Sequence, residues 1–348
     1  MIDFDFAKLR TIGLTQAIAS QLASIAPQAE GTRLVRVTEV QRDAVTVHDG
    51  DTWFTARTLP RLLSGQAGDV LAVGDWVLAD AAARVVQRFA PFTRLARRTA
   101  DGARQVLASN VDTALLVMGL DKDFKLRRIE RCLALVHAAG VAPVIVLTKA
   151  DIAPDAAERL AQMAQRLPAG VPMFALDGQR RDAAAVLDPW LGQGQTLILL
   201  GSSGAGKSTL TNTLSGASQA TGGVRQDDSR GRHTTSARSL HLCPGGACII
   251  DTPGLRALSP DADEEELSAA FGDIDSLAPS CQFRDCSHDS EPGCAVRGAV
   301  DPDRLSNYRK LLREARRATQ TPLDRIAERA KWKVLMKQAG ARGRQKRS

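Results

Sequence analysis

The segment TLILLGSSGAGKS, residues Thr196–Ser208, decides the fold of this chain. Its five leading apolar residues predict a buried strand, and the glycine-rich stretch that follows matches G-x-x-x-x-G-K-[ST] from Gly201 to Ser208. A helix is expected from about Lys207. This strand, loop and helix form a P-loop, in which backbone N–H groups and the positive end of the helix dipole surround a phosphate group. A glycine- and serine-rich loop without function is the alternative, and the flanking strand and helix disfavour it.

The segments on either side of the P-loop alternate between apolar strands and amphipathic helices, which is typical of a parallel sheet covered on both faces. We expect strands at Val111–Met118, Val144–Leu147, Val171–Ala175 and Cys248–Asp251, and helices at Leu126–Ala139 and Ala157–Leu167. The sequence therefore predicts an α/β nucleotide-binding domain over residues 101–260.

Three motifs in this domain have chemical roles. In the P-loop, Lys207 is expected to bridge the β- and γ-phosphates as a catalytic residue, and the Ser208 hydroxyl to bind Mg²⁺. Asp251-Thr252-Pro253-Gly254 is a D-x-x-G motif, whose aspartate holds Mg²⁺ through water and whose Gly254 N–H meets the γ-phosphate, so we count Gly254 among the catalytic residues.

The third motif, TKAD at Thr148–Asp151, follows a predicted strand and is similar to the guanine motif N-K-x-D. Asp151 would accept hydrogen bonds from guanine N1–H and the exocyclic amine, a pair of donors that adenine lacks, while Lys149 would lie along the base. Alone, TKAD is equally consistent with a helix-entry turn. Together with the other two motifs it predicts GTP as the nucleotide.

Two features depart from an ordinary GTPase. The motifs run in the order TKAD, P-loop, D-x-x-G, so the domain is circularly permuted. Leu255 occupies the position of the water-orienting glutamine, which predicts slow intrinsic hydrolysis. In the expected switch loop, GRHTT, Thr235 is favoured slightly over Thr234 as the Mg²⁺-sensing hydroxyl, and His233 is a candidate for positioning water. The alternative for His233 is a solvated loop residue.

The remainder of the chain divides around this core. Residues 1–31 are expected to contain a helix at Ala17–Ala26, and residues 32–100 to form a meander of about five strands. An oligonucleotide-binding (OB) barrel and an SH3-like barrel both fit that pattern. Residues 261–348 are expected to be helical and basic, with helices at Asp303–Ala318 and Pro322–Gln338 and a disordered tail over the last eight residues.

A cluster of metal-binding residues precedes these basic helices, with the spacing C-x4-C-x-H-x5-C. Four such donors suffice for a closed tetrahedral structural zinc site. The polar residues between them argue against the alternative of reduced core cysteines, which is the expectation for Cys132, Cys243 and Cys248. The expected zinc ligands are Cys281, Cys286, His288 and Cys294.

Composition limits the partners of the protein. The chain has 348 residues and a net charge of +7, but Arg304–Ser348 holds fifteen basic and three acidic residues, so this segment carries +12 and the preceding residues −5. With the arginine cluster Arg84, Arg88, Arg94, Arg97, Arg98 and Arg104, it suits a polyanion, although solvated surfaces are the alternative. Aromatic residues make up only 4%, which favours contacts to the RNA backbone over base stacking.

No signal peptide, transit peptide or run of roughly 20 apolar residues is present, so we expect no membrane role. The chain has six cysteines, three of them between Cys281 and Cys294, which fits a reducing compartment with a metal site better than a disulfide scaffold. We therefore expect a cytoplasmic protein.

Taken together, these motifs resemble the ribosome small-subunit-dependent GTPases of the RsgA/YjeQ family. The resemblance covers nearly the whole chain: VGDWV at Val73–Val77, NVDTALLV, FKLRRIERCLAL, the permuted motif order, GRHTT, DTPGL and the Cys₃His cluster. It implies an OB-fold N-terminal domain, a permuted P-loop GTPase domain and a C-terminal helical zinc domain. These would dock, as a monomer, on the 16S rRNA and neighbouring proteins of the small ribosomal subunit late in its maturation.

The resemblance also carries over site residues and cofactors: Mg²⁺ with GTP, and one structural Zn²⁺. Ser208, Thr235 and Asp251 would serve magnesium. The implied nucleotide-binding residues are Thr148, Lys149, Ala150, Asp151, Gly201, Ser202, Ser203, Gly204, Ala205, Gly206, Lys207, Ser208, Thr209 and Asp251. Two departures are Thr148 in place of asparagine, and Asp177-Gly178 where the family has a Ser-Ala pair behind the guanine.

Three functions therefore remain in competition. The first is a GTP hydrolase that is stimulated by the small subunit and whose turnover drives its own release. The second is a GTP-dependent RNA-binding switch in which hydrolysis is incidental, and the third is a P-loop ATPase or small-molecule kinase.

Overall fold

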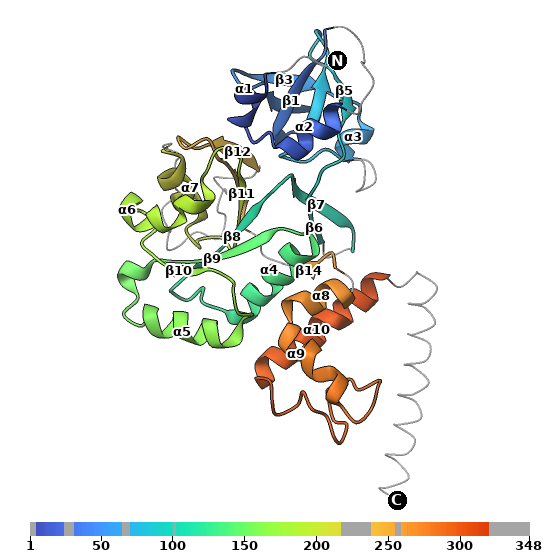
Figure 1. Cartoon of the computed structure of the whole chain (residues 1–348), viewed down its shortest axis with the longest axis vertical. Coiled ribbons are helices and arrows are strands. Elements are labelled where there is room, and N and C mark those ends of the chain that lie inside the picture. Colours follow the sequence, from blue (N-terminus) through green and yellow to red (C-terminus); the bar gives the residue numbers. More distant parts are fainter. Residues whose placement is uncertain are drawn as a thin grey trace, which may run out of the picture.

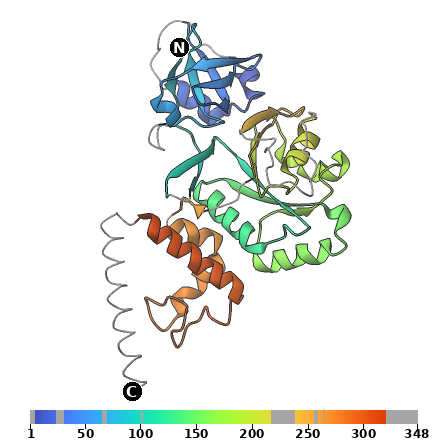
Figure 2. The same cartoon turned by 180° about the vertical axis from the view of Figure 1, so that it is seen from behind.

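The computed structural model describes residues 5–23, 31–64, 70–99, 102–216, 238–254, 259–262 and 264–319. A β-barrel, an α/β domain and a group of helices follow one another along the long axis of the molecule (Figure 1). The view from behind shows the barrel and the C-terminal helices at opposite ends, with the α/β domain between them (Figure 2). The expected helix at 322–338, the tail, the GRHTT loop and Leu255 lie outside the described residues.

The α/β domain is built on a sheet with the strand order β10-β9-β8-β11-β13-β12. The first five of these strands are parallel, and β12 pairs antiparallel with β13. The predicted strands are confirmed, and the structure adds β12 beside β13. Their bounds are β8 Thr113–Gly119, β9 Ala142–Thr148, β10 Met173–Ala175, β11 Thr196–Leu200, β12 Ser239–Leu242 and β13 Cys248–Asp251.

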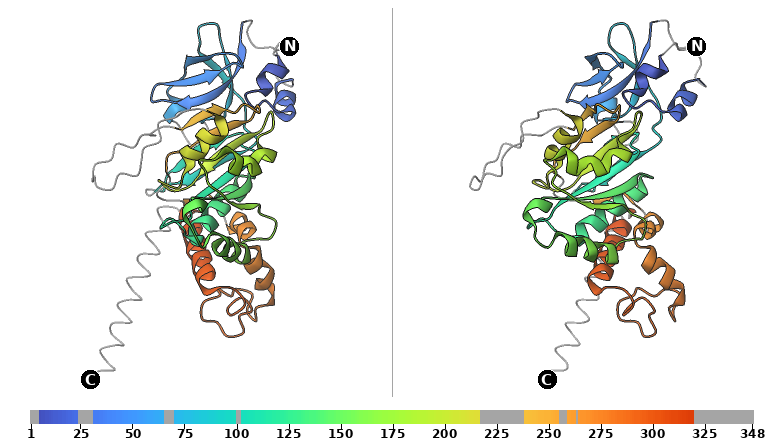
Figure 3. Two further views of the ribbon diagram at one scale, coloured as in Figure 1. Left: turned by 90° about the vertical axis from the view of Figure 1, so that its left-hand side faces the viewer. Right: turned by 60° about the vertical axis from the view of Figure 1, so that its left-hand side comes forward.

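Helices cover both faces of this sheet, as the alternating pattern predicted. Successive residues of β8 point to opposite faces: Leu116 packs in the hydrophobic cluster that contains α4 and α5, and Leu115 in the cluster that contains α7. A side view shows these helices on the two sides of the strands (Figure 3). Their bounds are α4 Leu126–Ala138, α5 Ala156–Arg166, α6 Arg181–Ala184 and α7 Lys207–Ser215, with 3₁₀ turns at Ala150–Ile152 and Ala185–Trp190.

The N-terminal barrel contains the five expected strands. β1 pairs with both β2 and β4, β2 pairs with β3, and β4 pairs with β5. A parallel bridge between Arg57 and Arg84 joins the end of β3 to the start of β5 and closes the ring. Val35, Val45 and Val77 fill its interior. The bounds are β1 Arg33–Val40, β2 Ala44–His48, β3 Trp53–Arg57, α3 Arg61–Ser64, β4 Trp76–Ala79 and β5 Val85–Arg88.

Two short helices precede the barrel, α1 (Phe6–Arg10) and α2 (Gln16–Ala23). The expected helix at 17–26 corresponds to α2. The sequence did not suggest α1, which is only five residues long and begins where the Asp5 side chain accepts a hydrogen bond from the Lys8 N–H.

The barrel and the α/β domain share one sheet, because Glu39 of β1 pairs with Ser239 of β12. Arg36, which is fully buried, donates hydrogen bonds to the carbonyl oxygens of Ile12 and Asn110 across the junction. This guanidinium group therefore links the N-terminal helices, the barrel and the α/β domain.

The arginine cluster that was expected to meet a polyanion lies largely on a hairpin that the sequence did not reveal. β6 (Arg94–Arg98) and β7 (Arg104–Ser109) pair with each other, and β14 (Ser259–Pro260) pairs with β6. Arg98 and Arg104 both form ion pairs with Asp261. Much of the cluster's charge is thus balanced within the chain, including the pairs Arg84–Asp80 and Arg88–Asp75.

The C-terminal helices are α8 (Glu264–Ala270), α9 (Gly272–Leu277) and α10 (Pro302–Thr319), the last close to the expected 303–318. α8 and α10 pack against α4, and α9 contacts α8. Phe271 and Leu311 belong to the same hydrophobic cluster as Leu133 of α4. Within the described residues, no helix combines the length and the apolar character needed to cross a membrane.

Candidate nucleotide site and metal centre

The P-loop connects β11 to α7, and two of its glycines are required by their surroundings. A Cβ on Gly201 would lie 2.2 Å from the carbonyl oxygen of Val117, so no side chain fits there. Gly206 has φ = +88° and caps the N-terminus of α7. The backbone therefore curls into a loop at the carboxyl end of the sheet, with the N-terminus of α7 facing into it.

Lys207, Ser208 and Asp251 meet at this loop. The Lys207 Nζ donates to the carbonyl oxygens of Gly201 at 3.1 Å and Ser202 at 2.7 Å, and burial lowers the pKa of this amine. The Ser208 hydroxyl donates to Asp251 Oδ2 at 3.0 Å. Two motifs that lie 43 residues apart in the sequence are thus joined by one hydrogen bond.

Asp251 is suited to serve a magnesium ion. Its side chain is buried at the end of β13, and burial raises the pKa of the carboxyl group. The Oδ2 atom is bonded to Ser208, whereas the buried Oδ1 atom has no hydrogen-bond partner. An orphaned carboxylate oxygen beside a serine hydroxyl is the hard oxygen donor set that Mg²⁺ prefers.

The D-x-x-G turn packs directly on the P-loop. A Cβ on Gly254 would lie 2.5 Å from both the N and Cα atoms of Ser203. The Thr252 hydroxyl, buried beneath the turn, donates to the carbonyl oxygen of Leu199 at 2.6 Å. Glycine at 254 therefore allows the close approach that brings its N–H to the edge of the phosphate loop.

The TKAD motif lies on the other side of the P-loop, at the end of β9. Thr148 donates through Oγ1 to the carbonyl oxygen of Ala205 at 2.6 Å. The threonine in place of asparagine therefore keeps a side-chain link between the base motif and the phosphate loop. Asp151 follows in the 3₁₀ turn Ala150–Ile152 with its side chain exposed.

The Asp177-Gly178 loop also reaches this position. The Gly178 carbonyl oxygen accepts a hydrogen bond of 2.7 Å from Thr213 of α7, and a Cβ on Gly178 would be 3.6 Å from Thr148. The loop therefore lies beside the base motif, where the second base-contacting loop of a guanine site is expected.

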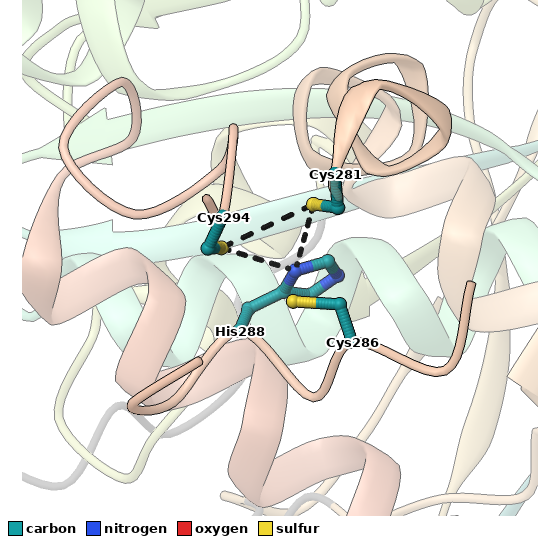
Figure 4. Close-up of side chains that lie close together, drawn as sticks. All are labelled: Cys281, Cys286, His288 and Cys294. Atoms are coloured by element: carbon teal, nitrogen blue, oxygen red, sulfur yellow. Dashed lines mark hydrogen bonds between the residues drawn. The ribbon is translucent and has the colours of Figure 1, made fainter. Parts of the chain in front are cut away.

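The four expected zinc ligands converge in the C-terminal domain. All four donor atoms lie within 4.8 Å of one another, and their side chains point toward a common centre (Figure 4). The Cys281 and Cys294 sulfurs are 3.6 and 3.5 Å from His288 Nδ1, and 4.0 Å from each other. A tetrahedral zinc ion, with bonds of about 2.3 Å to sulfur and 2.0 Å to nitrogen, separates its ligands by roughly 3.5–3.8 Å. The cluster therefore fits a four-coordinate zinc ion.

The loop around these ligands is held by its own hydrogen bonds. The Glu291 carboxylate accepts hydrogen bonds from the Ser287 hydroxyl and from the backbone N–H groups of Ser287, Asp289 and Ser290. These bonds, that of the hydroxyl above all, lower its pKa to about 2. These bonds support the left-handed backbone of His288, at φ = +57°.

Two thiols of this cluster differ in pKa. Burial raises the pKa of Cys286 to about 11. For Cys294, burial acts in the same direction, but hydrogen bonds from the Arg297 N–H and His288 prevail and hold its pKa at about 7.

Comparison with known proteins agrees with this geometry. The chain is 45% identical over 305 residues to the small ribosomal subunit biogenesis GTPase RsgA of Xanthomonas oryzae pv. oryzae (strain PXO99A), covering 84% of both chains. It is 47% identical over 265 residues to that of Xanthomonas axonopodis pv. citri (strain 306), covering 74% of this chain and 73% of the relative. The RsgA GTPase family model matches residues 89–260. The chain belongs to the RsgA family of GTPases.

Two solved structures share the fold of this family member. YjeQ from Thermotoga maritima superposes with a TM-score of 0.59 at 22% identity, covering 82% of this chain and 98% of the other. YloQ, described as a circularly permuted GTPase, superposes with a TM-score of 0.57 at 23% identity, covering 86% of this chain and all of the other. The circular permutation that the order of the three motifs predicted is therefore confirmed.

Some expected residues of the RsgA site lie outside the described part of the chain, namely His233, Thr234, Thr235 and Leu255. Conversely, the site includes two carboxylates that the motif search missed. Asp121 pairs with Lys149, and Asp123 accepts a hydrogen bond of 2.5 Å from the P-loop residue Ser202. Their position directly after the buried strand β8 could have indicated a role in the site, because loops at the carboxyl ends of parallel strands form the ligand site of such folds.

Proposed function

We propose that this protein hydrolyses GTP during maturation of the small ribosomal subunit and that turnover on the subunit drives its release. The convergence of three separate motifs at one edge of the sheet is the observation that carries the proposal. Within the P-loop, Lys207 donates to the Gly201 carbonyl oxygen and Ser208 is bonded to Asp251. Gly254 of the D-x-x-G motif packs against the same loop, and Thr148 joins the base motif to it. The relatives named for this biological role cover most of the chain.

Each residue of the site has an assigned role. The N–H groups of residues 201–206 and of the α7 N-terminus bind the β-phosphate, and Thr209 lies in the first turn of that helix. Lys207 leaves its carbonyl partners to bridge the β- and γ-phosphates, while the Gly254 N–H meets the γ-phosphate. Asp151 accepts from the guanine edge. Bound Mg²⁺, held through Ser208, Asp251 and Thr235, supplies positive charge against the phosphate oxygens.

The water-activating step is assigned to the switch loop. Leu255 provides no polar group at the glutamine position, so we assign the attacking water to His233. A group that the subunit supplies to the site would account for slow hydrolysis in isolation.

The two flanking domains are assigned to docking and to structure. We assign the closed five-stranded barrel to the OB class, because its short antiparallel strands and its bridge between β3 and β5 support that architecture. The zinc ion is structural, because its four protein ligands leave no open position. The +12 segment from Arg304 to Ser348 is assigned to 16S rRNA, and the protein to the cytoplasm as a monomer.

The decisive experiment measures GTP hydrolysis with and without purified small subunits. We expect stimulation by the subunit, and a loss of about a hundredfold or more in the Lys207→Ala variant. The Glu158→Ala variant, which removes an exposed carboxylate of α5, is the control for basal hydrolysis and should match the wild type. Equal competition by ATP would instead support an ATPase or kinase.

The same variant separates hydrolysis from the switch alternative. If hydrolysis drives release, Lys207→Ala protein that still binds subunits in the presence of GTP should remain bound. Release at the wild-type rate without hydrolysis would favour a GTP-dependent RNA-binding switch.

A further inference from the structure

A carboxylate beside the base motif has no role in the site described so far. Asp121 lies in the loop between β8 and α4, and both of its oxygens are engaged. Oδ2 accepts a hydrogen bond from Lys149 Nζ at 2.7 Å, and Oδ1 accepts one from the Asp123 N–H at 2.9 Å. The carboxylate is therefore held in one orientation, facing the lysine of TKAD.

The path of the Lys149 side chain is shaped by the same loop. A Cβ built on Gly119 would lie 3.5 Å from Lys149 Cδ and 2.8 Å from Asp121 Oδ1. The lysine stem thus passes over Gly119 before its ammonium group reaches Asp121. A side chain at 119 would crowd both partners of the ion pair.

The backbone of Lys149 gives a second, independent indication. Its φ angle is +63°, a left-handed conformation that L-residues other than glycine seldom adopt. Strained backbone of this kind persists where the surroundings impose it, most often at ligand sites. Here it turns the lysine stem toward Asp121 immediately before the turn that presents Asp151.

The outer side of the loop is also braced. The Arg159 guanidinium group lies 5.2 Å from the centre of the Phe124 ring and donates to the Asp121 carbonyl oxygen at 3.5 Å. The loop is thus fixed from α5 as well as from β9. Hydrogen bonding and the charge of Lys149 lower the pKa of Asp121 despite its partial burial, which keeps it ionised at neutral pH.

We propose that Asp121 is a positioning residue for the guanine base: it anchors the ammonium group of Lys149 so that the aliphatic stem is held against the flat face of the ring. This inference rests on the proposed assignment of Lys149 and Asp151 to guanine. The stem of a lysine is apolar and can cover an aromatic face while its charged end is bound elsewhere. Asp151 then reads the edge of the base, and Asp121 acts only through Lys149.

The test is a double-mutant cycle read as the Kd of a fluorescent GDP analogue. Asp121→Asn should raise Kd about two- to fivefold, the range for a partly exposed ion pair. Lys149→Met keeps an apolar stem without the charge, so adding Asp121→Asn to it should change Kd no further. The control Glu264→Gln removes another exposed ion pair, Glu264–Arg316 of the C-terminal helices, and should leave Kd unchanged.

Two results would overturn the proposal: an unchanged Kd in Asp121→Asn, or an equal loss in the Lys149→Met background, which would mark a role in loop folding alone. Asp151→Asn tests the underlying assignment separately. The new amide donates a hydrogen bond where the carboxylate accepted one, so this variant should bind GDP more weakly and xanthosine diphosphate more tightly. Adding Asp121→Asn to this variant should weaken the binding of xanthosine diphosphate by the same factor by which Asp121→Asn alone weakens the binding of GDP. Unaltered GDP binding by Asp151→Asn would reject the base assignment, and with it the role of Asp121.

Discussion

Glu130 of α4 holds the C-terminal helices to the GTPase domain through a fully buried charge. Its carboxylate accepts hydrogen bonds from Arg166 at 2.7 Å, from Arg304 at 3.0 Å and from Asn307 at 2.6 Å. Glu130 is 0% exposed and Arg304 2%. Arg304 continues the network to Asp273 of α9. One side chain thus connects α4, α5 and α10.

The expected cost of Glu130→Gln follows from these contacts. Removing one partner of a buried ion pair typically costs about 3–5 kcal/mol, because a buried charge is left uncompensated. Each arginine keeps a second acidic partner here, Asp273 for Arg304 and Asp303 for Arg166, which places the expected loss at the lower end. We expect about 3 kcal/mol, or a fall in Tm of about 6–12 °C for the transition that includes these helices.

Calorimetry measures the Tm of this unfolding transition, and hydrogen exchange shows which segments lose stability. Protection should fall in α10 and α4 but not in the barrel strands, and zinc content should remain the same. Glu264→Gln is the matched control, since its ion pair with Arg316 is exposed and should contribute no more than about 1 kcal/mol.

Equal effects of the two substitutions would refute this reasoning. A double-mutant cycle adds a second criterion: Arg304→Met should cost less in the Glu130→Gln background than alone, because the two changes remove the same interaction. Strictly additive losses would show that Glu130 and Arg304 do not act as a pair.

Two further predictions concern the zinc loop and the barrel. Cys286→Ser should abolish zinc binding and unfold the C-terminal domain while GDP binding persists, as measured by metal analysis and GDP titration, whereas Cys243→Ser should keep its zinc; unchanged zinc in the first variant would remove Cys286 from the ligand set. For Asp75, burial raises the pKa from its ordinary 3.8 to about 6, despite Arg88 nearby. The folded state therefore holds the proton more tightly than the unfolded state. The protonated carboxyl contributes about 3 kcal/mol to the free energy of unfolding, fully present below about pH 4 and lost as pH rises through 6. Unfolding free energies of wild type relative to Asp75→Asn should fall by about 2.5 kcal/mol between pH 4 and 7, and parallel pH profiles would contradict the pKa.

The sequence predicted the parts of this molecule that depend on local pattern. The strand Thr196–Leu200, the helix from Lys207 and the strand Cys248–Asp251 were all expected, since apolar runs and glycine-rich turns determine them locally. The permuted order followed directly from where the three motifs lie in the chain. The Cys₃His cluster could be predicted because all four of its members fall within fourteen residues.

The features that were missed depend on partners far away in the sequence. The hairpin β6–β7 lies in a stretch that reads as an arginine cluster, and its charges meet Asp261, more than 150 residues later. Asp121 carries no motif of its own. Its position becomes meaningful only when β8 and β9 bring it beside Lys149.

The sequence by itself thus determined the chemistry to be expected: the nucleotide motifs and the Cys₃His metal cluster each follow from residue types at short, fixed spacings. The tertiary structure alone decided how these units are joined. Arg36 at the barrel junction and Glu130 beneath the zinc domain are charged residues that a sequence reading places at the surface, yet both are fully buried. The physical reason is that a buried charge is stable only where its partners already surround it, and these partners, Asn110 and Arg304 among them, come from distant segments.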